Sequence, residues 1–172
     1  MSNDIQQQTT VNIQEKANLI WAIADKLVGV YKPHEYGNVI LPMCVIKRFE
    51  DTLTPTKQQV LDTNAKLDKD GIVVKKGFLE TAAGQQFYNL SPFTFQNLLN
   101  DPENIKDNFE SYLNHFSENV IDIIHRMDFD REIQKMADNN VLYLVIKEFC
   151  TPKAYLGADQ VTSVDMGYIF EE

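Results

Sequence analysis

Glycine is scarce in this 172-residue chain, which contains seven glycines and no Gly-x-Gly pair. Glycine-rich turns that cradle phosphate need closely spaced glycines, so the usual form of such a turn is excluded. There is no Gly-x-Ser-x-Gly motif, and the three histidines are far apart, with no His-x-x-x-His pair. Carboxylates are numerous, but nothing singles out a catalytic pair. The sequence therefore offers no catalytic, cofactor-binding or metal-binding residue to assign.

One group comes closest to the spacing of metal ligands, namely His125 with Asp122 and Asp128. Metal sites need such side chains to converge on one point, and this spacing alone does not establish that. We interpret the three side chains as polar groups on a solvated helix face.

Cysteines and long apolar runs are also few. Cys44 and Cys150 each stand alone in an apolar run, so we expect two buried, small hydrophobic side chains in a reducing compartment. The longest apolar run, residues 39–46, is far shorter than the roughly 20 residues of a membrane span. The N-terminus lacks the pattern of a signal peptide. These absences predict a soluble, cytoplasmic protein without a membrane partner.

Basic residues are outnumbered, 16 against 25 acidic residues, which gives a formal net charge of −9. A free-standing, nonspecific DNA binder is usually basic, so the chain as a whole does not fit that class. Basic residues adjoin at Lys47-Arg48 and Lys75-Lys76. Either pair could contact phosphate, but we interpret both as charges on a solvated face.

Helical periodicity is the main positive signal. One stripe recurs at the spacing of a helix face and contains Ile13, Ala17, Ile20, Ala24 and Leu27. Asn12 with Glu15 resembles a capping box, and Gly29 is placed to stop the helix. We therefore predict a flexible tail over residues 1–11 and a helix from residue 12.

A second helix is predicted in residues 34–53. The apolar run at 39–46 alone does not separate strand from helix, but Val45, Phe49 and Leu53 continue past it at helical spacing with charged residues between them. Pro42 is then either a first-turn residue or an interior kink. Residues 141–150 suit a helix face better than a strand.

Proline after Ser, Thr or Asp marks helix ends, because a cap residue and a residue before proline are both extended. The pairs Thr54-Pro55, Ser91-Pro92 and Asp101-Pro102 predict helix starts near residues 55, 92 and 102, and Thr151-Pro152 predicts a helix end. Ser117 and Asp128 are expected to cap helices at 118–127 and 129–138.

The best candidate for a strand or hairpin is "KDGIVVKKG", residues 69–77. Residues 82–91 are predicted to be irregular, turning at Gly84. Nearby aromatic residues could stack on bases or fill an interface, but we prefer core packing: Phe78, Phe87, Tyr88, Phe93 and Phe95. The predicted fold class is all-α, a mainly helical bundle-like domain with at most a minor short hairpin.

Four stretches resemble, in order, the modification (M) subunit of type I restriction–modification systems. They are "LIWAIADKLVGVYKPHEYGNVILPMCVIKRFEDTLTPTK", "AAGQQFYNLSPFTFQNLL", "FSENVIDIIHRMDFDREIQKMADNNVLYLVIKEF" and "MGYIFEE". The resemblance covers about residues 13–172. It implies a helical N-terminal domain over residues 12–160, followed at 161–172 by the start of a linker or helix toward a methyltransferase domain that the chain does not contain.

In that family the complete subunit is an adenine-specific DNA methyltransferase that transfers a methyl group from S-adenosylmethionine to adenine N6. Its glycine-rich cofactor turn and its Asn-Pro-Pro-Tyr/Phe motif match no residue here, and the chain has no Pro-Pro. The resemblance therefore implies a chain that holds no cofactor and is inactive alone.

The resemblance implies that this domain serves DNA clamping and subunit assembly. The implied partners are a specificity subunit, a restriction subunit, a second M subunit, and DNA in the assembled complex. The alternative is a stand-alone helical protein-interaction module without DNA-related activity.

Overall fold

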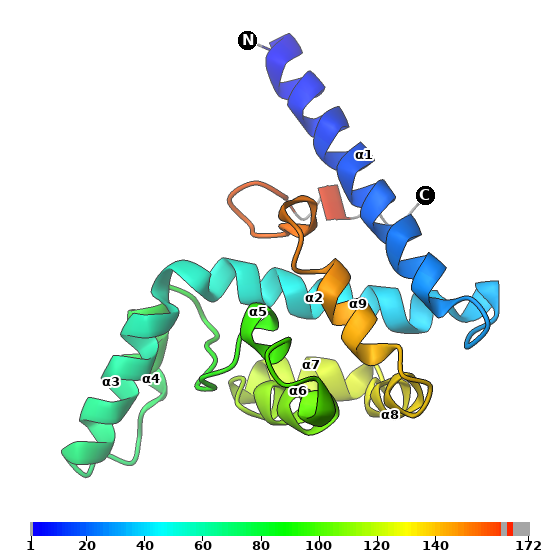
Figure 1. Cartoon of the computed structure of the whole chain (residues 1–172). Helices are drawn as coiled ribbons and strands as arrows, with labels where there is room; N and C mark the ends of the chain where they lie inside the picture. Colours follow the sequence, from blue (N-terminus) through cyan, green and yellow to red (C-terminus); the bar gives the residue numbers. More distant parts are fainter. Residues whose placement is uncertain (1, 163–164, 167–172) are drawn as a thin grey trace.

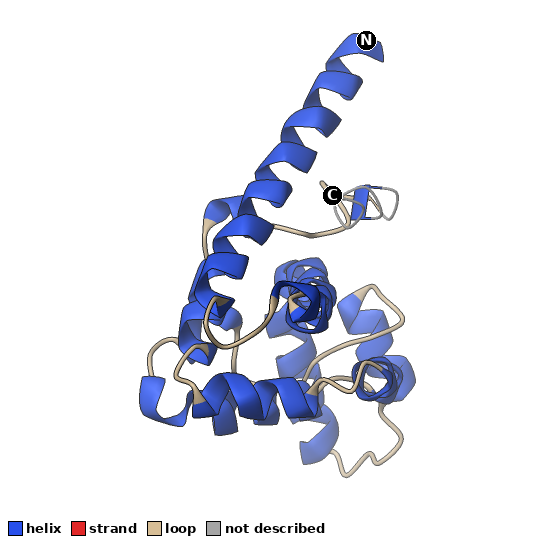
Figure 2. Cartoon of the chain, turned by 90° about the vertical axis from the view of Figure 1, so that its right-hand side faces the viewer, coloured by secondary structure: helices blue, strands red, loops and turns tan. Residues whose placement is uncertain are grey.

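The computed structural model describes residues 2–162 and 165–166, and side chains from residue 13 onward within those ranges. The described part consists of α-helices joined by loops and short 3₁₀ turns, and it contains no strand (Figure 2). The all-α prediction is confirmed.

Helix α1, Ser2–Leu27, is much longer than predicted. It begins ten residues before Asn12, so the predicted capping box is wrong and Asn12 lies inside the helix. No glycine or proline interrupts this stretch, and its glutamines are good helix formers. The boundary at residue 12 between a tail and a helical domain stays a prediction. The predicted stop is confirmed, because Gly29 has a φ of +87° just after the last helical residue.

Helix α2, Gly37–Leu53, lies across the middle of the molecule (Figure 1). Pro42 lies inside it, so the interior alternative is the right one. Buried residues occur around most of the helix, among them Val39, Met43 and Ile46. A helix that is buried on most of its sides belongs in a core, and this packing offsets the cost of the interior proline.

A helical hairpin projects from the body, and we call it the arm, residues 57–83 (Figure 1). It consists of α3, Lys57–Lys69, packed against α4, Lys76–Ala83. Between them, the predicted strand or hairpin at residues 69–77 is wrong. Residues 72–75 form a loop that has no strand partner in the described part of the chain. The residues on either side of this loop form the helices α3 and α4. No neighbouring strand is therefore available within the arm for residues 72–75 to pair with.

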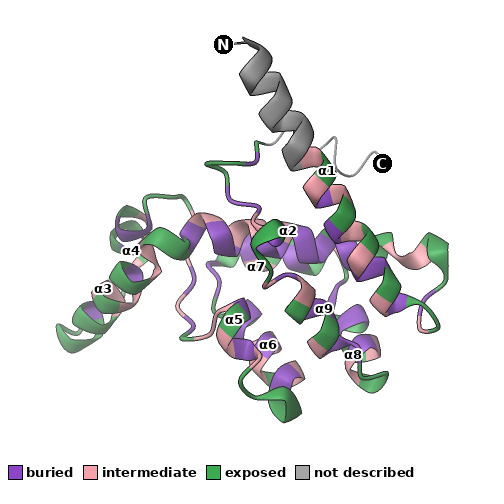
Figure 3. Cartoon of the chain, turned by 45° about the horizontal axis from the view of Figure 1, so that its top comes forward, coloured by how far each residue is buried: buried purple, intermediate pink, exposed green. Residues whose placement is uncertain are grey.

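The remaining helices complete the body of the molecule (Figure 1). They are α5, Phe95–Leu98; α6, Ile105–Asn114; α7, Glu118–Arg126; α8, Asp130–Asp138; and α9, Leu142–Glu148. Helix α9 contacts α1, α5, α6 and α8, so it ties the first helix to the rest. Figure 3 shows the buried residues concentrated along α2 and the helices that face it. Within the described residues, no helix is both long and apolar enough to cross a membrane.

The predicted helix ends are mostly confirmed. Thr54-Pro55 and Asp101-Pro102 each open a 3₁₀ turn that leads into α3 or α6. Helix α9 ends at Glu148, shortly before Thr151-Pro152, as predicted. Helix α4 ends at Ala83, and Gly84 turns with a φ of +68°, also as predicted.

One predicted start and one predicted cap residue are wrong, while the helices expected at 118–127 and 129–138 are present as α7 and α8. The helix expected near residue 92 begins at Phe95, because Thr94 provides the cap: its hydroxyl accepts a hydrogen bond from the Asn97 amide at 3.2 Å. Ser91 instead accepts from the amide of Phe93 and shapes the preceding turn. Ser117 does precede α7 as its N-cap residue. Asp128 does not cap α8; it has a φ of +51°, and the N-cap residue is Phe129.

The aromatic residues are mainly core residues, as predicted. Phe95 is 1% exposed, while Phe87, Tyr88 and Phe93 are half-buried and pack against the core. Phe78 is the exception, with 54% of its surface exposed.

The two cysteines are free, and their burial agrees with the sequence-based expectation. Cys44 is buried and Cys150 is partly buried. Burial raises the pKa of Cys44 to about 12 and that of Cys150 to about 11, so neither is a reactive thiol.

Candidate functional site

Three charged side chains lie buried on α2, and we call them the α2 charge cluster: Lys47, Glu50 and Asp51. Lys47 is only 6% exposed, so the predicted solvated face for Lys47-Arg48 is wrong. Buried charges are rare and are costly unless they are paired, which makes this cluster the first candidate for a functional site.

The cluster is hydrogen-bonded to a segment far from it in sequence, residues 151–162, which we call the C-terminal strap. The Nζ of Lys47 lies 2.5 Å from an oxygen of Asp51, one turn further along α2. The same Asp51 oxygen accepts a hydrogen bond from the Leu156 amide at 2.9 Å. Lys47 also donates to the carbonyl of Ala154 at 3.4 Å. Both members of the ion pair therefore satisfy backbone groups of the strap, which lies against α2 (Figure 1).

Two more cations fasten the strap from outside the cluster. Arg48 donates to the carbonyls of Leu156, at 3.2 Å, and Val161. Lys16 of α1 donates to the Lys153 carbonyl at 2.6 Å. Desolvation by burial lowers the pKa of both Arg48 and Lys16. Lys47 and Arg48, the basic pair that could have contacted phosphate, instead donate hydrogen bonds to backbone carbonyls of the strap.

Glu50 faces the other side of the cluster, toward α5 and α6. Its carboxylate accepts a hydrogen bond from the Phe95 amide at 2.9 Å and pairs with the hydroxyl of Tyr112. Burial raises the pKa of Glu50 to about 7, against the opposing influence of that amide, of Lys47 and of Lys57. Glu50 also lines a cavity of about 440 Å³ between α2, α5 and the strap.

Replacing Glu50 by Gln should make the stability of the protein less dependent on pH. Because the pKa of Glu50 is raised in the folded state, its contribution is present below its ordinary pKa of 4.5 and is lost as pH rises toward 7. Gln keeps an acceptor for Phe95 and cannot ionise. We expect the variant to be more stable than the wild type at pH 8, by roughly 2 kcal/mol, and to lose that advantage near pH 4.5. Urea denaturation at the two pH values measures this; equal differences at both would contradict the ionisation of a buried Glu50.

The polar atoms of this cluster make hydrogen bonds within the protein. Among the described residues, no buried side-chain nitrogen or oxygen lacks a hydrogen-bond partner. The hydrogen bonds of the cluster hold the strap and α5 against α2.

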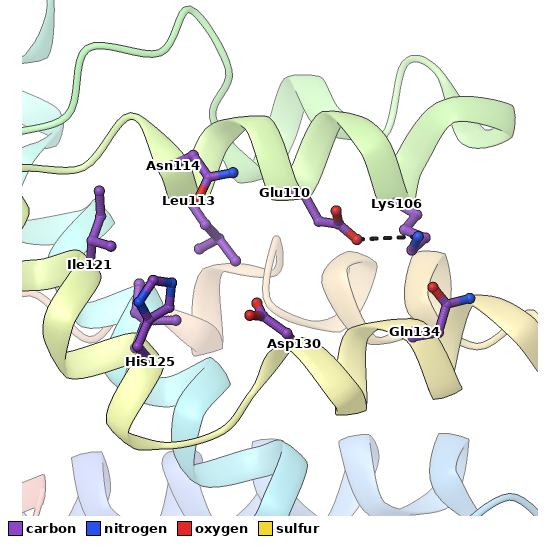
Figure 4. A pocket seen from close by; sticks show the side chains of 9 residues that line it. Lys106, Glu110, Leu113, Asn114, Ile121, His125, Asp130 and Gln134 are labelled. Atoms are coloured by element: carbon purple, nitrogen blue, oxygen red, sulfur yellow. Dashed lines mark ion pairs between the residues drawn. The ribbon is translucent and has the colours of Figure 1, made fainter.

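A second hollow of about 360 Å³ lies between α6, α7 and α8 (Figure 4). Lys106 and Glu110, both on α6, form an ion pair along one wall, 3.4 Å apart, and His125, Asp130 and Gln134 line the other wall. Its mixed charges are partly paired, and they define no single ligand chemistry.

The metal-like group of the sequence does not assemble. Asp122, His125 and Asp128 are all exposed. In the part of the chain that the structure describes, no group of three or more His, Cys, Asp or Glu side chains is arranged to hold a metal ion. The interpretation as solvated helix-face polarity agrees with these positions.

The pair Lys75-Lys76 lies at the start of α4. Lys76 is exposed, with its Nζ 3.9 Å from a carboxylate oxygen of Glu80, as expected for a solvated face. Lys75 is half-buried; it donates to the Asn64 side chain at 3.0 Å and pairs with Asp68. One lysine of this pair is therefore available at the surface.

The fold and the cluster define a helical domain whose buried charges hold structure together. A family model described as the HsdM N-terminal domain matches residues 16–149. The chain belongs to this family, the N-terminal domain of the modification subunit of type I restriction–modification systems. No curated protein and no solved structure matched the chain significantly.

Proposed function

We propose that this domain serves DNA clamping and subunit assembly in a type I restriction–modification complex, and that methyl transfer belongs to a separate methyltransferase domain of the M subunit. The observation that carries the proposal is the family match over residues 16–149. The closed α2 charge cluster supports it, because the buried charges are committed to the strap and to α5 rather than to a substrate.

The partners in this proposal are a specificity subunit, a restriction subunit, a second M subunit and DNA. S-adenosylmethionine would bind the methyltransferase domain, not this one. The net charge of −9 fits a clamp component that meets DNA over a small area and has an acidic outer surface. The complex would act on DNA in the cytoplasm. Membership in the family does not favour the stand-alone interaction module.

Co-purification of the chain with the specificity subunit of its own system tests the proposal. We expect a complex that survives size-exclusion chromatography, and tighter binding of a cognate DNA duplex by the complex than by the chain alone. Alone, the chain should bind duplex weakly and lose that binding as salt is raised from 50 to 200 mM. A folded chain that repeatedly fails to bind the specificity subunit would support the interaction-module alternative.

A further inference from the structure

The end of the arm exposes an unusual amount of apolar surface. We call residues 69–78 the arm tip. Within it, Val73 is 88% exposed, Val74 is 81% exposed and Phe78 is 54% exposed. Exposed apolar side chains that adjoin one another, as Val73 and Val74 do in sequence, are typical of interaction sites. The same stretch carries the strand-like sequence pattern that the fold leaves without a partner.

The arm does not need these side chains for its own stability. Its helices bury a separate set of residues between them, including Val60, Leu67 and Leu79. Polar residues at positions 73 and 74 would leave that small core intact. The exposed valines are therefore not explained by the folding of the arm.

Two backbone amides of the arm tip have no acceptor within the described part of the chain. Ile72 donates its amide to the Leu67 carbonyl at 2.9 Å, but the amides of Val73 and Val74 find no acceptor among the described residues. Exposed N–H groups beside β-branched side chains are suited to pairing with carbonyls of another chain.

The charge of the arm differs from that of the rest of the molecule. The arm contains five of the 16 basic residues but only four of the 25 acidic residues. Lys66, Lys69 and Lys76 are exposed close in sequence to the valines, and so are Asp68 and Asp70, which leaves an excess of positive charge in this stretch. An apolar centre with an excess of neighbouring cations is complementary to an apolar patch edged by carboxylates.

We propose that the arm tip docks on the specificity subunit, against an apolar surface of that subunit that is rimmed by carboxylates and offers backbone carbonyls to Val73 and Val74. This inference rests on the proposed assembly function and assigns it to one surface. Protein is favoured over DNA, because Asp68 and Asp70 share the arm tip region with its lysines and because the centre of the patch is apolar.

The test compares two variants of equal charge change for binding to the specificity subunit by calorimetry. The variant Val73→Asp/Val74→Asp places carboxylates in the patch, and Val28→Asp/Gly37→Asp makes the same change of charge at exposed positions outside the arm; Val28 is 66% exposed. We expect the arm-tip variant to bind about 30-fold more weakly and the control to stay within about twofold of wild type. Circular dichroism and the midpoint of thermal unfolding should show that the arm-tip variant is folded.

Each other outcome contradicts the inference in a different way. If the wild type binds and the arm-tip variant binds equally well, the inference fails while the proposed function stands. If the wild type does not bind, both fail. Loss of affinity for a DNA duplex alone would assign the arm tip to nucleic acid, and loss of self-association in sedimentation would assign it to a second copy of the chain.

Discussion

Replacing Asp51 by Ala is expected to lower the free energy of unfolding by about 3–5 kcal/mol, because it leaves Lys47 as an uncompensated buried charge. The side chains of both residues are below one-tenth exposed, and the ion pair is 2.5 Å long. The substitution also removes the acceptor of the Leu156 amide, which is buried with it. Urea denaturation at pH 7 measures the loss.

A matched variant distinguishes the cost of leaving Lys47 charged and unpaired from the cost of removing the ion pair as a whole. Lys47→Met/Asp51→Asn removes both charges and keeps an amide oxygen for Leu156. Because neither group is then left charged and unpaired, the variant should stay within about 1–2 kcal/mol of the wild type. A loss as large as that of Asp51→Ala would show that the ion pair itself stabilises the fold. A small loss from Asp51→Ala would show that the strap does not depend on Asp51.

The second large effect is expected at Phe95, where Phe95→Ala should cost about 3–5 kcal/mol. The ring is 1% exposed and meets Phe109, Tyr112 and Phe149 at centroid distances of 6.1, 6.0 and 6.2 Å. These contacts join α5, α6 and α9, so the cavity left behind lies where three helices meet.

Phe78→Ala is the control for that prediction, since it removes the same atoms from an exposed site. It should change the free energy of unfolding by less than about 0.5 kcal/mol. Equal losses at Phe95 and Phe78 in denaturant titrations would contradict the burial that the structure assigns to these residues.

The helices could be predicted because their apolar residues recur at a helical period. The stripe that includes Ile20 and Leu27 indicated α1, and Gly29 marked its end correctly. The start of α1 could not be located in the same way, since the polar residues before Asn12 carry no apolar stripe. Capping patterns were less informative: Thr94, not Ser91, caps α5, because the cap depends on which hydroxyl reaches a free amide.

The α2 charge cluster was not predictable from neighbours in sequence. Lys47 and Asp51 have the spacing of an ordinary exposed helix pair, and their burial arises from a strap that is about a hundred residues away in the chain. One signal was available: the pair adjoins the most apolar run of the sequence, residues 39–46. Even so, only the packed fold shows that backbone groups of the strap take up the charges.

The arm shows the opposite case, in which local preference was clear and the fold did not follow it. Val73 and Val74 favour a strand, but a strand requires a neighbour, and the flanking residues form helices. The pattern remained as an exposed loop, and this mismatch is the basis of the docking surface proposed for the arm tip.

We propose that the buried charges of this domain are structural and that its function lies on its surface. The most direct measurement is the dissociation constant of the Lys47→Met/Asp51→Asn variant for the specificity subunit, determined by calorimetry with the folded protein. We predict a value within about twofold of wild type, because the variant leaves the surface unchanged. A folded variant that binds more than about tenfold more weakly would contradict the claim and would assign a direct role in assembly to the α2 charge cluster.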